Sequence, residues 1–268
     1  MPGVMSHDTA FFGASTIFGK YWTKHRYFDY LIDKDNFRLS FGKSFRMMVY
    51  LDNAVANGPA AVRQDVEADT KATNYLINHL GDIKPELTVF VTTADMLPHD
   101  ADENTPTIRS SDDPYVQNRI NMYQAVNRQF GRVLNVHLTE IANPRPEFNP
   151  LLHTLLHPDT VKGKLPFAPL ERHQLYLPQR IMGDVERCIP LGIPSIIPAM
   201  PELTTMELVE LFAPQLLDKL PTPSPDDPIG SCRKSIHSFQ WLDPKDGYLL
   251  TREDQIELLK FYFLPELL

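Results

Sequence analysis

Apolar segments of strand length alternate with helical patterns along the first half of the sequence. The stretches 47–52 and 87–93 are apolar, β-branched runs, which is typical of strands buried on both faces of a sheet. The stretch 133–138 is expected to be a further strand. A helical pattern over 62–80 and a second one that stops at Gly131 separate these stretches. The alternation predicts an α/β fold with a parallel sheet flanked by helices and with ligands at the carboxyl ends of the strands.

Capping signals mark where several helices begin. Asp113 is expected to be an N-cap because Pro114 follows at the first helical position. The segment Thr204–Glu207 matches a capping box, so a helix is predicted to start there. Thr251 is the expected N-cap of a late helix that Pro265 should end.

The second half of the chain is less regular. From Asn143 onward prolines become frequent, and this predicts irregular chain in place of further regular strand–helix units. The pattern over 179–192 still predicts a helix between two short strands. We therefore expect a nucleotide-binding core over residues 1–142, and a part over 143–268 that contributes late core elements and a small mixed lobe.

Composition excludes several classes of protein. With 43% hydrophobic residues among 268, the chain is long enough to bury a substantial core. A formal charge of −8 without any basic cluster argues against a nucleic-acid partner. No apolar run reaches bilayer length and residues 1–8 resemble no targeting segment, so we expect a soluble or peripheral protein. Cys188 and Cys232 show no disulfide spacing, which favours a reducing compartment.

The segment "TAFFGASTIFGKYW" (9–22) places an apolar strand before two glycines and a helix start. Such a turn presents backbone N–H groups and the positive end of a helix where a pyrophosphate can bind. Thr16 stands where such turns usually keep a middle glycine, so the turn is recognisable but narrowed. The residues expected to contact a dinucleotide here are Gly13, Ser15, Thr16, Ile17, Phe18 and Gly19.

The chain between this turn and the strand at Met47 is short. It has room for one helix and one strand, so the fold is predicted to be abridged after the first helix, on the adenosine side. If "DYLID" is the second strand, Asp33 can accept a hydrogen bond from the ribose 2′-hydroxyl of NAD. If "FRLSF" is that strand, Arg38 or Lys43 can meet the 2′-phosphate of NADP. The sequence leaves both alternatives open.

Four segments resemble, in order, the extended short-chain dehydrogenase/reductase family. They are "FGASTIFGKYW", "VYLDNAVANGPA", "VFVTTADML" and "PYVQNR". The resemblance implies a Rossmann-like fold in which Thr93 hydrogen-bonds a substrate oxygen, Tyr115 is the acid/base, and Arg119 stands where the family has a lysine. It also implies further cofactor contacts from Asn53, Ala54, Thr92, Tyr115 and Arg119.

The exchange of lysine for Arg119 changes the expected chemistry. Tyr115 and Arg119 are four residues apart and share one face of a helix, so a cation there would favour the tyrosinate. Arginine keeps the charge, but its planar fork cannot take the place of a compact ammonium that must also bind the nicotinamide ribose. We therefore expect Thr93, Tyr115 and Arg119 to be vestigial, with no active catalytic residue.

Four segments look like the short-chain-dehydrogenase-like accessory subunits of mitochondrial respiratory complex I. They are "FFGASTIFGKYW", "SSDDPYVQNRINMYQAV", "FNPLLHTLLH" and, most of all, "YLLTREDQIELLKFYFLPEL". That resemblance implies a non-catalytic structural subunit on the matrix side of the inner membrane, peripheral to it. Its partners would be other complex I subunits near the junction of the quinone module and the membrane arm. It implies a structural NADP(H), which can be lost. The alternative is a soluble NAD(P)-dependent sugar epimerase or reductase.

Two groups of residues resemble metal sites only superficially. His153 and His157 have an i, i+4 spacing, but no glutamate follows the first histidine and no third ligand is evident, so we expect no metal. The acidic residues of "ADMLPHDADE" lack the alternation and the turn glycine of a calcium loop. We interpret Asp95 and its acidic neighbours as a solvated loop.

Overall fold

The computed structural model describes residues 8–230, 232–238 and 246–264. They form two compact units, each of which is described by itself. The first unit contains the chain up to Met96, residues 107–138 and residues 178–196, and the second contains 97–106, 139–177 and the chain from Ile197 on. The helix end expected at Pro265 and the N-terminal residues 1–7 lie outside the described residues.

A six-stranded parallel sheet forms the centre of the first unit. Its strand order is β11-β7-β6-β4-β1-β2, and every neighbouring pair is parallel. The strands are β1 (Thr9–Phe12), β2 (Tyr30–Ile32), β4 (Met47–Leu51), β6 (Thr88–Thr93), β7 (Val133–Leu138) and β11 (Ser195–Ile196). The chain grows outward from β1 to β2 and then returns to the other side of β1, so the ends of β1 and β4 form the crevice where α/β sheets bind ligands. The predicted Rossmann-like sheet is confirmed.

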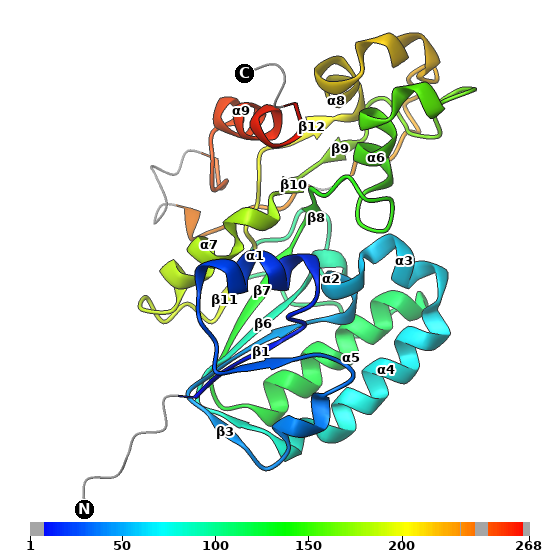
Figure 1. Cartoon of the computed structure of the whole chain (residues 1–268). Coiled ribbons are helices and arrows are strands. Elements are labelled where there is room, and N and C mark those ends of the chain that lie inside the picture. The colour runs from blue at the N-terminus through cyan, green and yellow to red at the C-terminus, as the bar shows by residue number, and fades with distance from the viewer. Residues whose placement is uncertain (1–7, 231, 239–245, 265–268) are drawn as a thin grey trace, which may run out of the picture. The chain divides into compact units, whose positions relative to one another are not determined.

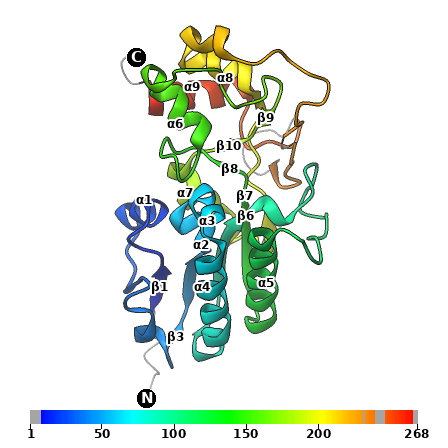
Figure 2. The ribbon, with the colours of Figure 1, turned by 90° about the vertical axis from the view of Figure 1, so that its right-hand side faces the viewer.

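Helices cover the sheet of the first unit. They are α1 (Ile17–His25), α2 (Asn53–Asn57), α3 (Pro59–Gln64), α4 (Val66–His79), α5 (Pro114–Gln129) and α7 (Ile181–Cys188). Figures 1 and 2 show α4 and α5 running side by side along the sheet, and α1 contacts α7. Both α7 and β11 come from residues 178–196, so a late segment of the chain completes this unit.

Successive residues of β1 face opposite sides of the sheet. Phe12 packs edge-on against Phe37 and belongs to the core that the end of α5 closes with Val126. Phe11, on the other face, packs edge-on against Trp22 of α1 with ring centroids 5.4 Å apart. Large apolar side chains on both faces of one strand explain why β1 reads as a continuous apolar run.

The sheet is abridged at its β2 edge. No strand lies beyond β2 in the described sheet, and residues Phe37–Ser40 form a 3₁₀ helix, η1. The earlier of the two candidate segments is therefore the second strand, and the later one is not a strand. Between η1 and β4 the chain adds only β3 (Ser44–Phe45), which pairs with β5 (Lys84–Pro85) in a separate two-stranded sheet.

The helix predicted over 62–80 is interrupted. It forms α3, then α4, then the 3₁₀ helix η2 (Leu80–Asp82). Asp65 breaks it because its backbone leaves the helical region, with φ −131°, and its side chain accepts a hydrogen bond from the Ala68 N–H as a new N-cap. The break lets α4 run in its own direction along α5.

The second unit has its own apolar core and two small sheets. Parallel β8 (Glu140–Ile141) and β10 (Leu175–Tyr176) form one, and antiparallel β9 (Arg172–His173) and β12 (Leu203–Thr204) form the other. Its helices are α6 (Pro150–Leu156), α8 (Thr205–Phe212) and α9 (Arg252–Phe263). The predicted N-caps are confirmed: Thr204 and Glu207 form a capping box on α8, and Thr251 caps α9.

Candidate nucleotide and substrate site

The turn between β1 and α1 has the backbone geometry of a phosphate-binding turn. Gly13 has φ +96°, a conformation that favours glycine, and its N–H donates to the Ile32 carbonyl at 2.8 Å. A Cβ on Gly19 would lie 2.3 Å from the carbonyl oxygen of Gly13. Both glycines are therefore needed, the first for the bend and the second for the close approach of α1.

Thr16 stands in place of the middle glycine, and its hydroxyl links the two glycines of the turn by hydrogen bonds. Its hydroxyl donates to the Gly13 carbonyl at 2.6 Å and accepts from the Gly19 N–H at 3.1 Å, so Thr16 is the N-cap of α1. The Gly19 amide is thereby used inside the turn. The amides of Ile17 and Phe18 belong to the first turn of α1, whose N–H groups have no acceptor within the helix. They are the donors best placed to meet a pyrophosphate.

Asp33 follows β2 and reaches back to the same turn. Its carboxylate accepts from both the amide and the hydroxyl of Ser15, at 3.1 and 2.9 Å. This places an acid beside the phosphate turn, where a ribose would lie. Arg38 lies exposed on η1, and the ammonium of Lys43 lies 4.7 Å from the centre of the Tyr30 ring.

The three cofactor contacts expected from β4 and β6 lie around a buried acidic pair. Asn53 begins α2 and donates to Asp69 of α4 at 2.7 Å, and Thr92 donates to Asp52 at 2.6 Å. Ala54 is fully buried beside them in α2. Asn53 and Thr92 therefore hold the two carboxylates in place, a role that the sequence did not suggest.

Tyr115 lies in the first turn of α5, near the end of β6. Its amide donates to the N-cap Asp113 at 2.9 Å, and its hydroxyl lies 3.4 Å from Thr93 Oγ1. The same hydroxyl donates to Asp95 Oδ2 at 2.7 Å. Burial, reinforced by the Asp95 carboxylate, raises the pKa of Tyr115 well above its ordinary value. The tyrosine and threonine expected to act together do lie together, with the phenol held neutral.

Arg119 is buried between two carboxylates. Its Nη2 donates to both oxygens of Asp69, at 2.7 and 2.9 Å, and its Nε lies 3.1 Å from Asp52 Oδ2. Burial raises the pKa of Asp52, although the guanidinium opposes that change. The Arg119 guanidinium carbon also lies 5.2 Å from the centre of the Tyr115 ring, so the charge faces the ring. The charge at position 119 is thus committed to Asp52, which directly follows β4, and to Asp69 of α4.

Besides Asp52 and Asp69, sequence reasoning missed two residues that contact Tyr115. Asp95, expected in a solvated loop, lies in the 3₁₀ helix η3 (Ala94–Met96) and binds the Tyr115 hydroxyl. Arg63 of α3 places its guanidinium 3.8 Å from the centre of the Tyr115 ring and binds Asp113 at 2.9 Å. The position of Asp95 two residues after Thr93, at the carboxyl end of a strand, was a signal that could have found it. Nothing in the local sequence pointed to Arg63.

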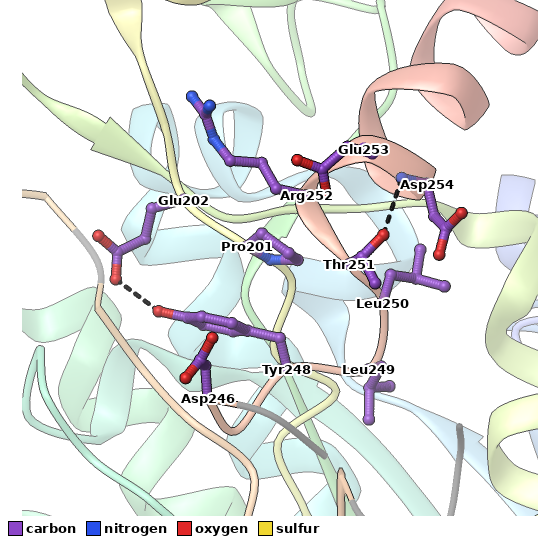
Figure 3. A pocket seen from close by; sticks show the side chains of 10 residues that line it. All are labelled: Pro201, Glu202, Asp246, Tyr248, Leu249, Leu250, Thr251, Arg252, Glu253 and Asp254. Atoms are coloured by element: carbon purple, nitrogen blue, oxygen red, sulfur yellow. Dashed lines mark hydrogen bonds between the residues drawn. The ribbon is translucent and has the colours of Figure 1, made fainter. Parts of the chain in front are cut away.

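A cavity of 690 Å³ in the second unit is lined by none of the candidate site residues (Figure 3). Tyr248 donates to Glu202 at 2.9 Å on one side, and the N-cap Thr251 accepts from the Asp254 amide on the other. The full lining is Pro201, Glu202, Asp246, Tyr248, Leu249, Leu250, Thr251, Arg252, Glu253 and Asp254. Four carboxylates against one guanidinium make it unsuited to an anionic nucleotide.

The histidine pair in the second unit binds backbone carbonyls. His153 Nδ1 lies 3.0 Å from the Pro144 carbonyl oxygen, and His157 Nδ1 lies 2.8 Å from that of His153. Among the described residues no cluster of three potential metal ligands is found.

Comparisons with known proteins show the fold. No family profile matches the chain, and no curated protein matches it in sequence. Its structure is similar to UDP-glucose 4-epimerase from Thermotoga maritima, with 12% identity, 97% and 100% of the two chains covered and a TM-score of 0.64. It is also similar to TunA, an NAD-dependent NDP-hexosamine 5,6-dehydratase, with 11% identity, 96% and 97% coverage and a TM-score of 0.68. A third similar structure is dTDP-4-dehydrorhamnose reductase from Yersinia enterocolitica, with 10% identity, 96% and 99% of the two chains covered and a TM-score of 0.66.

These neighbours contradict the expectation of a complex I subunit in the mitochondrial inner membrane. They are an epimerase, a dehydratase and a reductase whose names refer to nucleotide-linked sugars, and none is a respiratory subunit. Two of the four segments that suggested complex I contain α6 and α9, whose Leu152 and Leu259 pack into the core of the second unit. Capped helices of that kind serve internal packing and identify no partner. Over the described residues, no helix has the length and apolar character needed to cross a bilayer. The chain has the Rossmann-like fold of extended short-chain dehydrogenase/reductase enzymes.

Proposed function

We propose that this chain is an NAD(P)-dependent enzyme that acts on a nucleotide-linked sugar, and that it works as a reductase. The observation that carries the proposal is the pair Thr93 and Tyr115, whose hydroxyls lie 3.4 Å apart where β6 ends. The neighbouring structures support the substrate class. Two of them hold NAD together with a UDP-sugar, and another holds NAD and UDP.

The residues of the β1–α1 turn fit a dinucleotide. Gly13 and Gly19 approach each other closely and carry no side chains that would cover the backbone of the turn. The amides of Ile17 and Phe18 would bind the pyrophosphate. Asp33 would accept from the adenosine ribose, exchanging its bonds to Ser15 for those of the sugar hydroxyls. A 2′-phosphate would meet the Asp33 carboxylate, so NAD is the expected cofactor over NADP. When bound, the reduced nicotinamide supplies a hydride.

The neutral state of Tyr115 favours reduction of a carbonyl over oxidation of an alcohol. A carbonyl that receives a hydride needs a proton at its oxygen, and a phenol that keeps its proton can donate it. Oxidation needs the same tyrosine to have lost its proton, which its raised pKa opposes. Arg119, whose charge is neutralised by Asp52 and Asp69, does little to offset this. Thr93 would hydrogen-bond the substrate oxygen and orient it toward Tyr115.

Consumption of NADH or NADPH with nucleotide-linked 4-keto sugars tests the proposal. We expect turnover with NADH, and Tyr115→Phe should reduce kcat by about 10²–10⁴-fold because it removes the acid. Dinucleotide binding, measured by calorimetric titration, should change little. Tyr123→Phe is the matched control, since Tyr123 is a half-buried tyrosine of the same helix whose ring packs near His137. The proposal fails if the protein binds no dinucleotide, or if Tyr115→Phe turns over like the unaltered protein.

A further inference from the structure

The Tyr115 hydroxyl is connected to solvent through a single carboxylate. Tyr115 is 1% exposed and cannot exchange its proton with water directly. Its hydroxyl donates to Asp95 Oδ2 at 2.7 Å, and the Asp95 side chain is 34% exposed. A proton can therefore pass between water and the phenol in two short steps through Asp95.

The other groups around the phenol are less suited to this role. Arg119 keeps its proton throughout, because arginine does not deprotonate in proteins and two carboxylates hold its charge. Arg63 lies over the ring and 3.7 Å from Asp95 Oδ1, so it is also a fixed cation. Asp113 binds Arg63 and the Tyr115 amide, so its carboxylate is engaged away from the Tyr115 hydroxyl. Thr93 carries a hydroxyl that does not titrate in the working range.

We propose that Asp95 relays protons from water to Tyr115 during the reaction, an inference that rests on the proposed reductase function. The substrate carbonyl carbon gains a hydride from the reduced dinucleotide, which is oxidised by two electrons. The carbonyl oxygen takes the Tyr115 proton, and the phenolate oxygen takes the proton of the Asp95 carboxyl group. Water then returns one proton to Asp95. In sum, one carbonyl, one hydride and one proton from solvent give an alcohol.

The relay gives the activity a defined pH dependence. Asp95 can deliver a proton only in its protonated form, so we expect reduction through the relay to slow as pH rises. The carboxylate also slows the reaction, because the Tyr115 hydroxyl donates its hydrogen to Asp95 Oδ2, with 2.7 Å between the two oxygens, and not to the substrate. Asp95 acts through Tyr115 and is thus a positioning and relay residue, whereas Tyr115 is the catalytic one.

The pH profile of kcat tests the relay, with variants that remove or keep a carboxyl group. Asp95→Asn and Asp95→Ser should lose the decline with rising pH and lower kcat at acidic pH by about tenfold or more. Asp95→Glu keeps a carboxyl group and should keep the decline. Asp112→Asn changes an exposed acid just before the N-cap of α5 and should retain the profile of the unaltered protein. Thermal melting and NAD titration establish that each variant is folded.

The outcomes separate the relay from the proposed function. Turnover with the pH profile unchanged in both Asp95→Asn and Asp95→Ser overturns the relay and leaves the reductase intact. Absence of turnover in the unaltered protein overturns both. A profile that flattens in the two variants without a carboxyl group, and not in Asp95→Glu, supports the relay, since loss of packing alone would not follow the presence of an ionisable group.

Discussion

The β1–α1 turn and the Tyr115 helix each depart at one position from the family motif that the sequence resembles, and the two departures are accommodated differently. At the turn, the Thr16 hydroxyl finds both of its partners within three residues, Gly13 and Gly19. On α5, the Arg119 guanidinium is bound by Asp52 and Asp69, from elements far away in the sequence. A neutral hydroxyl can be satisfied locally, whereas a buried charge requires charged partners from other elements. Replacing Thr16 with the glycine of the motif should therefore cost little stability, whereas replacing Arg119 should cost much more.

Removal of Arg119 should have the largest effect on stability. Arg119→Met leaves Asp52 and Asp69 buried and unpaired, so we expect a loss of about 3–5 kcal/mol in the free energy of unfolding. Urea denaturation measures it. The exposed Arg128 of the same helix is the matched control, and Arg128→Ala should change stability by less than about 0.5 kcal/mol.

The same site can be repaired if the comparison is right. Adding Asp52→Asn and Asp69→Asn to Arg119→Met removes the unpaired charges and should recover most of the lost stability. An Arg119→Met protein as stable as the unaltered one would show that the guanidinium does not balance the carboxylates.

The glycine at the helix entry should give the next largest effect. Gly19→Ala places a methyl group 2.3 Å from the Gly13 carbonyl oxygen, so α1 must move away from the turn. We expect a loss of about 1–3 kcal/mol together with loss of dinucleotide binding. Gly183→Ala is the control, because Gly183 is also helical, in α7, and no atom lies within 4 Å of an added Cβ. It should be neutral or stabilising by up to about 1 kcal/mol. Equal effects of the two changes would disprove the close approach.

The sequence predicted those parts of the fold that local patterns determine. The strands β4 and β6 are buried on both faces, and so they appear as apolar, β-branched runs. N-caps at Asp113 and Thr251 were found because a cap bonds within three residues. The break at Asp65 was missed because helix-forming residues continue on either side of it.

The site was only partly predictable, because most of its contacts join distant segments. Thr93 and Tyr115 were paired through their order in a known motif. The carboxylates around Arg119 come from the residue after β4 and from α4, and no spacing rule brings Asp69 to a residue fifty positions later. The comparison with respiratory subunits failed for the related reason that the patterns of α6 and α9 reflect packing inside their own unit.

Thr16 should give the smallest change and the sharpest test of the turn. Thr16→Ala removes the N-cap and should cost about 1 kcal/mol, whereas Thr16→Gly should cost only a few tenths (~0.3 kcal/mol). Thr16→Gly also frees the Gly19 N–H for a phosphate oxygen, a hydrogen bond worth about 0.5–1.5 kcal/mol, or roughly two- to tenfold in the Kd of NAD. Thr251→Ala removes the equivalent cap from α9 and should cost similar stability without affecting the Kd. If Thr16→Gly weakens NAD binding, the Thr16 hydroxyl contributes to binding the cofactor. The threonine then serves the phosphate as well as the helix cap.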